Sequence, residues 1–244
     1  MSGTAVLLSG GLDSAVLVAD EAARGHGEVQ PIYVSVGLAW EDAERATASR
    51  FLAAAAFRGR VRPLVSLAVD MRDVYEATHW AVQGRPPSYH TPDEDVYLPG
   101  RNIVLLGKAG VFCAATALDR LVLGTLAHNP FPDATPEFRA SMAQTLSLGL
   151  AHPLEIDAPY AGTSKADVVR RGVALGVPFE HTLSCMNPPG SGNRDESGFE
   201  SRFPETESRT HCGLCSKCRE RHDAFLEVGV DDPTQYEDRR YVGA

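Results

Sequence analysis

The feature that most constrains the fold is a regular alternation of short apolar runs with helical segments. Five apolar runs have the length and composition of strands that are buried on both faces. They lie at residues 4–9, 29–36, 61–69, 120–125 and 154–157. Five helical patterns follow them in turn, at residues 14–24, 41–57, 103–118, 137–150 and 164–175, the second of which opens on acidic residues as the helix dipole favours. Repeated strand–helix units predict an α/β fold, a parallel twisted sheet with helices on both faces.

The loop after the first predicted strand is rich in glycine and hydroxyl groups. It consists of Ser9, Gly10, Gly11, Leu12, Asp13 and Ser14. Two glycines allow the backbone to approach an anion closely, and the free N–H groups of a helix N-terminus attract negative charge. Asp13 would face a phosphate only across a cation such as Mg²⁺. The pattern predicts a phosphate-binding loop, and a simple Gly-Gly turn capped by serine is the alternative.

Four cysteines in the last 60 residues have the number and spacing of metal ligands. Cys212, Cys215 and Cys218 follow one another at three-residue intervals, and Cys185 supplies a fourth thiolate. Four thiolates complete a closed tetrahedral zinc site, which has no open position for water and therefore indicates a structural role. An iron–sulfur cluster is the alternative, since Cys-x-x-Cys spacing serves both metals.

The residues around these cysteines carry further expectations. Gly213 is expected to allow the knuckle turn between two ligands. Lys217, Arg219 and Arg221 are expected to offset the negative charge of a four-thiolate centre. The fifth cysteine, Cys113, lies among apolar residues of a helical segment and is expected in the core.

We expect two units along the chain. Residues 1–180 would form a nucleotide-binding α/β domain. Residues 181–244 would form a small zinc-binding helical extension, because so short a polar segment needs a metal to hold it together. Within the extension, residues 187–211 are rich in Gly, Ser, Pro and mixed charge, which is the composition of a flexible insertion.

Composition narrows the class of protein. Of the 244 residues, 43% are hydrophobic and 23% are charged, which is ordinary for a globular protein. No apolar run approaches the roughly 18 residues of a membrane span, and no basic segment precedes the first apolar stretch, so a cytoplasmic protein is expected. The net charge of -9 disfavours non-specific binding of nucleic acid.

The phosphate-loop pattern resembles that of the PP-loop ATP pyrophosphatases. Together with the four cysteines, it makes the chain resemble the 7-cyano-7-deazaguanine synthase (QueC/ExsB) family over nearly its full length. Shorter motifs of that family occur in the same order at residues 98–102, 123–124, 131–133, 136–138, 164–167 and 182–185, and the match ends at Arg221. The resemblance implies that ATP and ammonia convert 7-carboxy-7-deazaguanine to the nitrile preQ0. The carboxylate would become an amide and the amide a nitrile, each through an adenylate.

The resemblance also implies roles for individual residues, with ATP, Mg²⁺ and Zn²⁺ as cofactors and a homodimer as the assembly. Catalytic roles fall on Asp13, Ser14, Arg101 and Lys165. Nucleotide contacts fall on the six loop residues and on Val34, Val36, Arg101 and Gly124. Substrate contacts fall on Trp40, Asn102, His128, Phe131 and Asp133. Simple alternatives stay open: a solvated helix lysine for Lys165, core packing for Trp40, and the start of a helix for Asp133.

The departures from the family pattern lie on the substrate side. Residues 36–40 read Val-Gly-Leu-Ala-Trp where the family usually has Tyr-Gly-Gln-x-His. Ala134 and Thr135 replace the usual Cys-Arg, and 26 residues separate Cys185 from Cys212. Three other functions therefore stay open. They are a paralogue that acts on another carboxylate or stops at the amide, a PP-loop tRNA thiolase, and a nucleotide- and zinc-binding module without catalysis.

Overall fold

The computed structural model describes residues 3–189 and 211–242, and the structural statements below concern these ranges. Within them, five strands form one parallel sheet in the order β3-β2-β1-β4-β5. The strands are β1 (Thr4–Leu7), β2 (Val29–Ser35), β3 (Val65–Ala68), β4 (Arg120–Val122) and β5 (Glu155–Asp157). Because every neighbouring pair is parallel, the carboxyl ends of all the strands lie at the same edge of the sheet.

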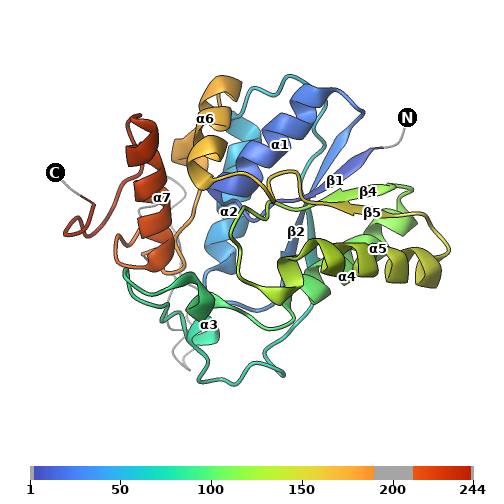
Figure 1. Cartoon of the computed structure of the whole chain (residues 1–244), viewed down its shortest axis with the longest axis horizontal. Coiled ribbons are helices and arrows are strands. Elements are labelled where there is room, and N and C mark those ends of the chain that lie inside the picture. Colours follow the sequence, from blue (N-terminus) through green and yellow to red (C-terminus); the bar gives the residue numbers. More distant parts are fainter. Residues whose placement is uncertain (1–2, 190–210, 243–244) are drawn as a thin grey trace.

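Helices join the strands and cover both faces of the sheet. They are α1 (Leu12–Arg24), α2 (Glu41–Ala54), α3 (Trp80–Gln83), α4 (Arg101–Ala115), α5 (Pro136–Leu150), α6 (Lys165–Leu175) and α7 (Ser216–Val228), with short 3-10 helices η1 (Asp93–Val96), η2 (Pro132–Ala134) and η3 (Phe179–His181). Figure 1 shows α1 and α6 above β1, β4 and β5, and α4 and α5 below them. The predicted α/β architecture is therefore confirmed. None of the described helices is long and apolar enough to cross a membrane.

Alternate side chains of the central strand separate two cores. Val6 packs with α1 and α6 in a cluster that includes Val168. Its neighbour Ala5 belongs to a second cluster with α4, where Cys113 is buried as predicted. Since the strand is buried on both faces, its sequence is a continuous apolar run rather than an alternation.

The third strand is shorter than the sequence pattern predicts. Val61 pairs with Val29 only through an isolated bridge, and β3 proper begins at Val65. Pro63 lies between them, and proline has no N–H to donate to the ladder. The predicted strand at residues 61–69 is therefore longer than the segment that pairs regularly with β2, which is Val65–Ala68.

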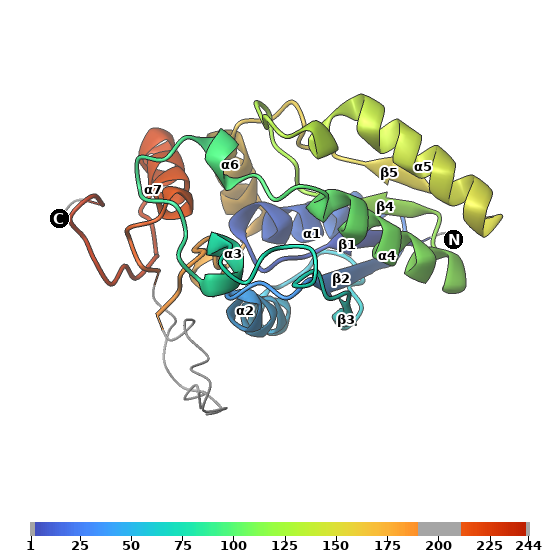
Figure 2. The same cartoon turned by 90° about the horizontal axis from the view of Figure 1, so that it is seen from below.

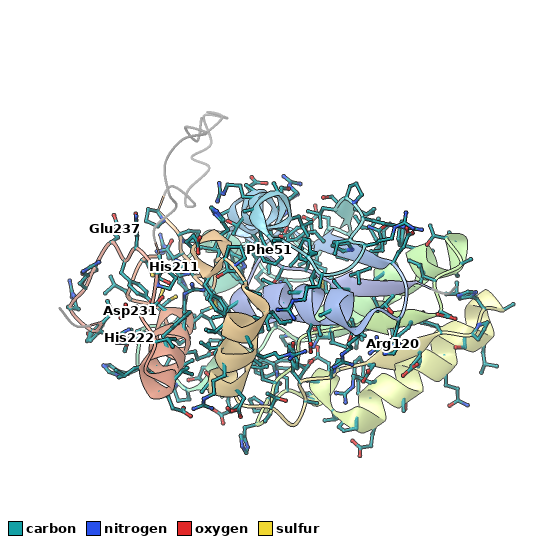
Figure 3. All side chains as sticks on the ribbon, turned by 90° about the horizontal axis from the view of Figure 1, so that it is seen from above. Phe51, Arg120, His211, His222, Asp231 and Glu237 are labelled. Carbon is teal, nitrogen blue, oxygen red and sulfur yellow. The ribbon has the colours of Figure 1, made fainter. Side chains whose placement is uncertain are left out.

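The C-terminal residues pack against the sheet domain. Figures 1 and 2 show α7 beside α6, and Ala224 and Phe225 of α7 belong to the same core cluster as α1 and α6. The chain after α7 then returns to His211, whose carbonyl oxygen accepts from the N–H of Glu237; Figure 3 labels both residues at this end of the molecule. Apart from residues 187–189 and 211, the predicted insertion lies outside the described residues. The division into two units near residue 180 stays a prediction.

Candidate functional site

The phosphate-loop residues form a tight turn between β1 and α1. Gly10 has a φ of +79°, and a Cβ atom on it would lie 2.6 Å from the carbonyl oxygen of Glu44, so packing against α2 requires glycine here. The Oγ atom of Ser9 accepts from the N–H of Gly11 (3.2 Å), and the Ser14 hydroxyl donates to the Gly11 carbonyl (3.0 Å). Gly11 is the N-cap of α1 and offers no capping side chain. The N–H groups of the first turn are therefore available to an anion.

Two adjoining cavities open over this loop at the carboxyl edge of the sheet, where parallel α/β folds bind ligands. The inner cavity, of about 280 Å³, lies against the ends of β1, β2 and β4, and its walls include Ser14 and Val34. The outer cavity, of about 640 Å³, extends from the loop toward α6 and α7, and Leu12 lies in its wall. Residues that line both cavities include Ser9, Gly11, Asp13, Glu44, Arg101 and Gly124.

Lys165, the first residue of α6, lies between two carboxylates. Its Nζ atom is 3.1 Å from Oδ2 of Asp13 and 3.0 Å from Oε2 of Glu220 in α7. Burial acts to lower the pKa of Lys165, but the two carboxylates outweigh it and raise that pKa, so the ammonium form is favoured. Burial likewise opposes ionisation of Glu220, yet Lys165 and Lys217 lower the pKa of Glu220 to about 2. The alternative of a solvated helix lysine therefore does not hold for Lys165.

Asp13 lines both cavities, and only one of its two carboxylate oxygens has a partner among the described residues. Oδ2 pairs with Lys165, whereas Oδ1 is buried and has no hydrogen-bond partner among the described residues. Carboxylate oxygens are the preferred protein ligands of Mg²⁺. The chemistry of this oxygen therefore fits a divalent cation, and Asp13 is the loop residue that would hold one.

The start of α4 brings a second cation to the cavities. Arg101 lines both of them, and its buried Nε atom lacks a hydrogen-bond partner within the described part of the chain. The next residue, Asn102, donates from its backbone N–H to Oδ2 of Asp133 (3.1 Å) and from Nδ2 to the Asp133 carbonyl (3.0 Å). Asp133 thus fixes the start of α4, a structural contact that does not depend on a substrate. Both residues also line the inner cavity.

Three of the predicted substrate residues line the outer cavity, but they present different surfaces to it. Trp40 is only 3% exposed and stacks on Trp80 with ring centroids 5.8 Å apart, so packing occupies one of its faces. Phe131 stacks on Tyr97 at 5.1 Å. His128 is exposed and has a φ of +59° within the loop between β4 and η2. Their roles toward a substrate stay predictions.

Two predicted nucleotide contacts, Gly10 and Val36, line neither cavity. The carbonyl of Gly10 accepts from the N–H of Leu183, which joins the phosphate loop to the segment before Cys185. Val36 is fully buried, and its N–H donates to Oε1 of Glu41 at 2.8 Å. The first acidic residue of α2 therefore fixes the loop after β2, in addition to suiting the helix dipole.

Glu44 and Glu220 are candidate site residues that the sequence reasoning missed. Glu44 lines both cavities, and its Oε2 atom accepts from the Tyr33 hydroxyl at 3.0 Å. Burial raises the pKa of Glu44 to about 7, although nearby Arg101 opposes the rise. Glu220 reaches Lys165 only because α6 and α7 pack together. In the sequence, Glu44 belongs to an acidic first turn and Glu220 to a helix with many charged residues. Both patterns are typical of solvent-exposed helices and do not indicate a site.

The four predicted metal ligands converge. All four cysteines are buried, and their Sγ atoms lie within 4.8 Å of one another. The separation is 3.5 Å between Cys215 and Cys218, 3.9 Å between Cys212 and Cys218, and 4.0 Å between Cys185 and Cys215. Zinc–sulfur bonds of about 2.3 Å in a tetrahedron place sulfur atoms about 3.8 Å apart. The cluster therefore fits a single metal ion.

Gly213 adopts the turn that the spacing of the cysteines requires. Its φ is +74°, and a Cβ atom would lie 1.9 Å from the carbonyl oxygen of Asp238. We expect Gly213→Ala to lower the free energy of unfolding by about 3 kcal/mol or more, because positive φ costs about 1–2 kcal/mol before any clash. Thermal unfolding checks this, and Gly229→Ala is the matched control. Gly229 has the same backbone conformation (φ +73°) with open space around its Cβ position, so equal losses in both variants would contradict the clash.

The basic residues near the cysteines make their main contacts elsewhere. Arg221 is fully buried and donates to Oγ1 of Thr182 (2.7 Å) and to the carbonyl of Phe179 (3.0 Å), which ties α7 to η3. Lys217 pairs with a carboxylate of its own helix, and Arg219 donates to a backbone carbonyl in the loop before η1. Cys218 nevertheless acts on the charge of Arg221, and the expectation that these side chains offset the thiolate charge stays a prediction.

The fold and this site define a class of protein. A parallel sheet leads from its first strand through a glycine-rich loop into a helix, and a lysine and an arginine converge on that loop, as in PP-loop proteins. The sequence also matches the family described as "Queuosine biosynthesis protein QueC" over residues 4–229. The chain belongs to the QueC family and is an enzyme of that family.

Relatives at about 30% identity cover almost the whole chain. The 7-cyano-7-deazaguanine synthase of Methanosphaerula palustris is 31% identical, over 95% of this chain and 98% of its own length. The protein of the same name from Methanopyrus kandleri is 32% identical, over 97% of this chain and 99% of its own. Among solved structures, a predicted tRNA methyltransferase subunit from Methanocaldococcus jannaschii aligns at 16% identity, over 70% of this chain and 73% of its own, with a TM-score of 0.44, which carries no further conclusion.

Proposed function

We propose that this enzyme makes 7-cyano-7-deazaguanine from 7-carboxy-7-deazaguanine, ATP and ammonia. The substrate carboxylate attacks the α-phosphorus of ATP, pyrophosphate leaves, and ammonia displaces AMP to give the amide. A second round of adenylation on the amide oxygen gives the nitrile. The observation that carries the proposal is the convergence of Asp13, Arg101 and Lys165 on an uncapped helix N-terminus, where two cavities adjoin.

The two cavities suit the two reactants. The inner cavity combines the apolar ends of β2 and β4 with the phosphate loop, so it suits a nucleoside with its phosphates over α1. The outer cavity is the larger of the two, and its walls include the aromatic ring of Trp80 and the ammonium of Lys217, which pairs with Glu220. We assign the acceptor to it. The carboxylate of the acceptor would then meet the α-phosphate of ATP beside the residues that line both cavities, such as Asp13 and Arg101.

The residues at the loop act chiefly by electrostatics. Lys165 and Arg101 present fixed positive charge to the leaving pyrophosphate, which is most valuable in a site that excludes water. Glu220 holds the Lys165 ammonium in place, and Asp13 offers its Oδ1 atom to a cation. Mg²⁺, when bound there, would offset the phosphate charges. Zn²⁺ would be held by the four cysteines in a structural role, because four thiolates leave no open position.

The proposal includes the oligomeric state and the cellular location of the enzyme. A homodimer follows from the family resemblance. A cytoplasmic location follows from the need to keep four thiols reduced for metal binding. An ATP-dependent ligase that stops at the amide is the second candidate, since residues 36–40 and 134–135 depart from the family pattern on the substrate side.

A direct assay tests the proposal. The purified protein is incubated with ATP, Mg²⁺, ammonium and 7-carboxy-7-deazaguanine, and the products are followed by mass spectrometry. We expect the amide to appear first and the nitrile later, with two AMP released for each nitrile. Amide without nitrile would favour the second candidate, and AMP release only with other acids would contradict the assigned substrate. Absence of nucleotide turnover with every acceptor would favour a binding module.

A further inference from the structure

Glu44 is a buried carboxyl at the junction of the two cavities to which the mechanism above assigns no role. It lies one turn into α2, beside the phosphate loop, and lines both cavities. Polar and charged side chains of β2, α4 and the start of α2 act on it. Tyr33 of β2 donates to its Oε2 atom, Trp40 donates a side-chain hydrogen bond to it, Arg101 of α4 attracts it, and Glu41 of its own helix repels it.

The proposed reaction needs a base at this place. After adenylation, the amide nitrogen carries two protons, and both must leave before the nitrile is complete. As the last N–H bond breaks, its electron pair forms the third carbon–nitrogen bond. The carbon–oxygen bond breaks in the same step, so that the carbon keeps four bonds, and its electrons leave with AMP. A positioned carboxylate that accepts the proton typically contributes about 10²–10⁴-fold to such a step.

We propose that the Glu44 carboxylate accepts this N–H proton and is a catalytic residue for nitrile formation; the inference rests on the proposed function. Among the described residues, carboxylates that line both cavities are those of Asp13 and Glu44. Asp13 is paired with Lys165 and is assigned to a cation. Glu44 instead accepts from neutral donors, the Tyr33 hydroxyl and the Trp40 side chain, and a carboxylate with its four lone-pair sites can still accept from the substrate nitrogen.

The acid strength of Glu44 suits this task. Burial raises its pKa to about 7, where a carboxylate is basic enough to take a proton and still ionised in part at neutral pH. The ionised form is the active one. Nitrile formation is therefore expected to rise with pH through about 7 and then to level off.

The test starts from the amide, because this round consumes no ammonia and its pH profile is free of the ammonium equilibrium. Glu44→Gln is expected to lower nitrile formation by about 10²–10⁴-fold and to remove the rise through pH 7. Isotope exchange between pyrophosphate and ATP, measured with the amide present, should continue because adenylation does not need this base. A variant that retains the nitrile rate and the pH profile of the wild type would overturn the inference.

Two further variants separate catalysis from folding. Tyr33→Phe removes a hydrogen bond that lowers the pKa of Glu44, so the rise in its pH profile should move to higher pH; an unmoved profile would contradict the assignment. Asp42→Asn is the matched control, because it removes an exposed carboxylate that pairs with Arg45 on the same helix, and its profile should equal that of the wild type. Wild-type protein that makes no nitrile from the amide would overturn the proposed function, and this inference with it. Wild-type nitrile formation with an unaffected Glu44→Gln would overturn this inference alone.

Discussion

Asp13→Asn is expected to lower AMP formation by about 10²–10³-fold, while the metal held by the four cysteines and the folded structure remain unchanged. The substitution removes the negative charge that would hold a cation against the phosphates, a type of interaction worth roughly 3–4 kcal/mol in a transition state. The structure explains why folding should survive. Oδ1 has no hydrogen-bond partner among the described residues to lose, and an asparagine oxygen still accepts from Lys165.

The measurement is the initial rate of AMP release under the assay conditions, with metal content determined on the same sample. Asp119→Asn is the control, because Asp119 is an exposed aspartate that lines neither cavity. AMP formation by Asp13→Asn at the wild-type rate would contradict the assignment of residues 9–14 as a phosphate-binding loop. Loss of activity together with loss of bound metal would indicate a folding defect instead.

Cys215→Ser is expected to abolish metal binding and to destabilise the C-terminal part of the chain. Structural zinc contributes on the order of 10 kcal/mol to small zinc-binding units, and Cys215 lies within 4.0 Å of two other ligand sulfurs. A loss of at least about 4 kcal/mol would lower the melting temperature by roughly 8–16 °C in a chain of this size. AMP formation should also fall, because α7 carries Glu220, the partner of Lys165.

Elemental analysis and thermal unfolding check this second prediction. Cys113→Ala is the control for a lost thiol, because Cys113 of α4 is buried in the core and takes no part in the cluster. It should keep the metal while losing some stability. Zinc in the wild type and none in Cys215→Ser is the expected result. Iron with visible absorbance would contradict a zinc site and revive the iron–sulfur alternative.

Much of this site can be predicted from the sequence because its chemistry is local. The six loop residues are contiguous, and a glycine pair between a buried strand and a helix has few other uses. Three of the four cysteines lie within seven residues of one another, so their spacing indicates a shared metal before any fold is known. Both predictions depend on residues that are close in the chain.

Contacts between residues that are distant in the chain could not be predicted from the sequence. Asp133 satisfies the start of α4, a helix that begins 32 residues before it. Val36 is buried, and its N–H donates to Glu41, whereas Arg221 ties α7 to η3. Composition and periodicity carry no information about such partners, because each contact joins elements that meet only in the folded sheet.

The sequence by itself determined the parallel α/β class, the phosphate loop and the cysteine cluster, since strand burial, backbone freedom at glycine and ligand spacing are local properties. Only the tertiary structure decided which carboxylates serve the site. Glu44 and Glu220 have the sequence context of exposed helix residues. Packing of α2 against the loop, and of α7 against α6, removes them from water and places them beside Tyr33 and Lys165, and that change of surroundings gives them their acid strengths.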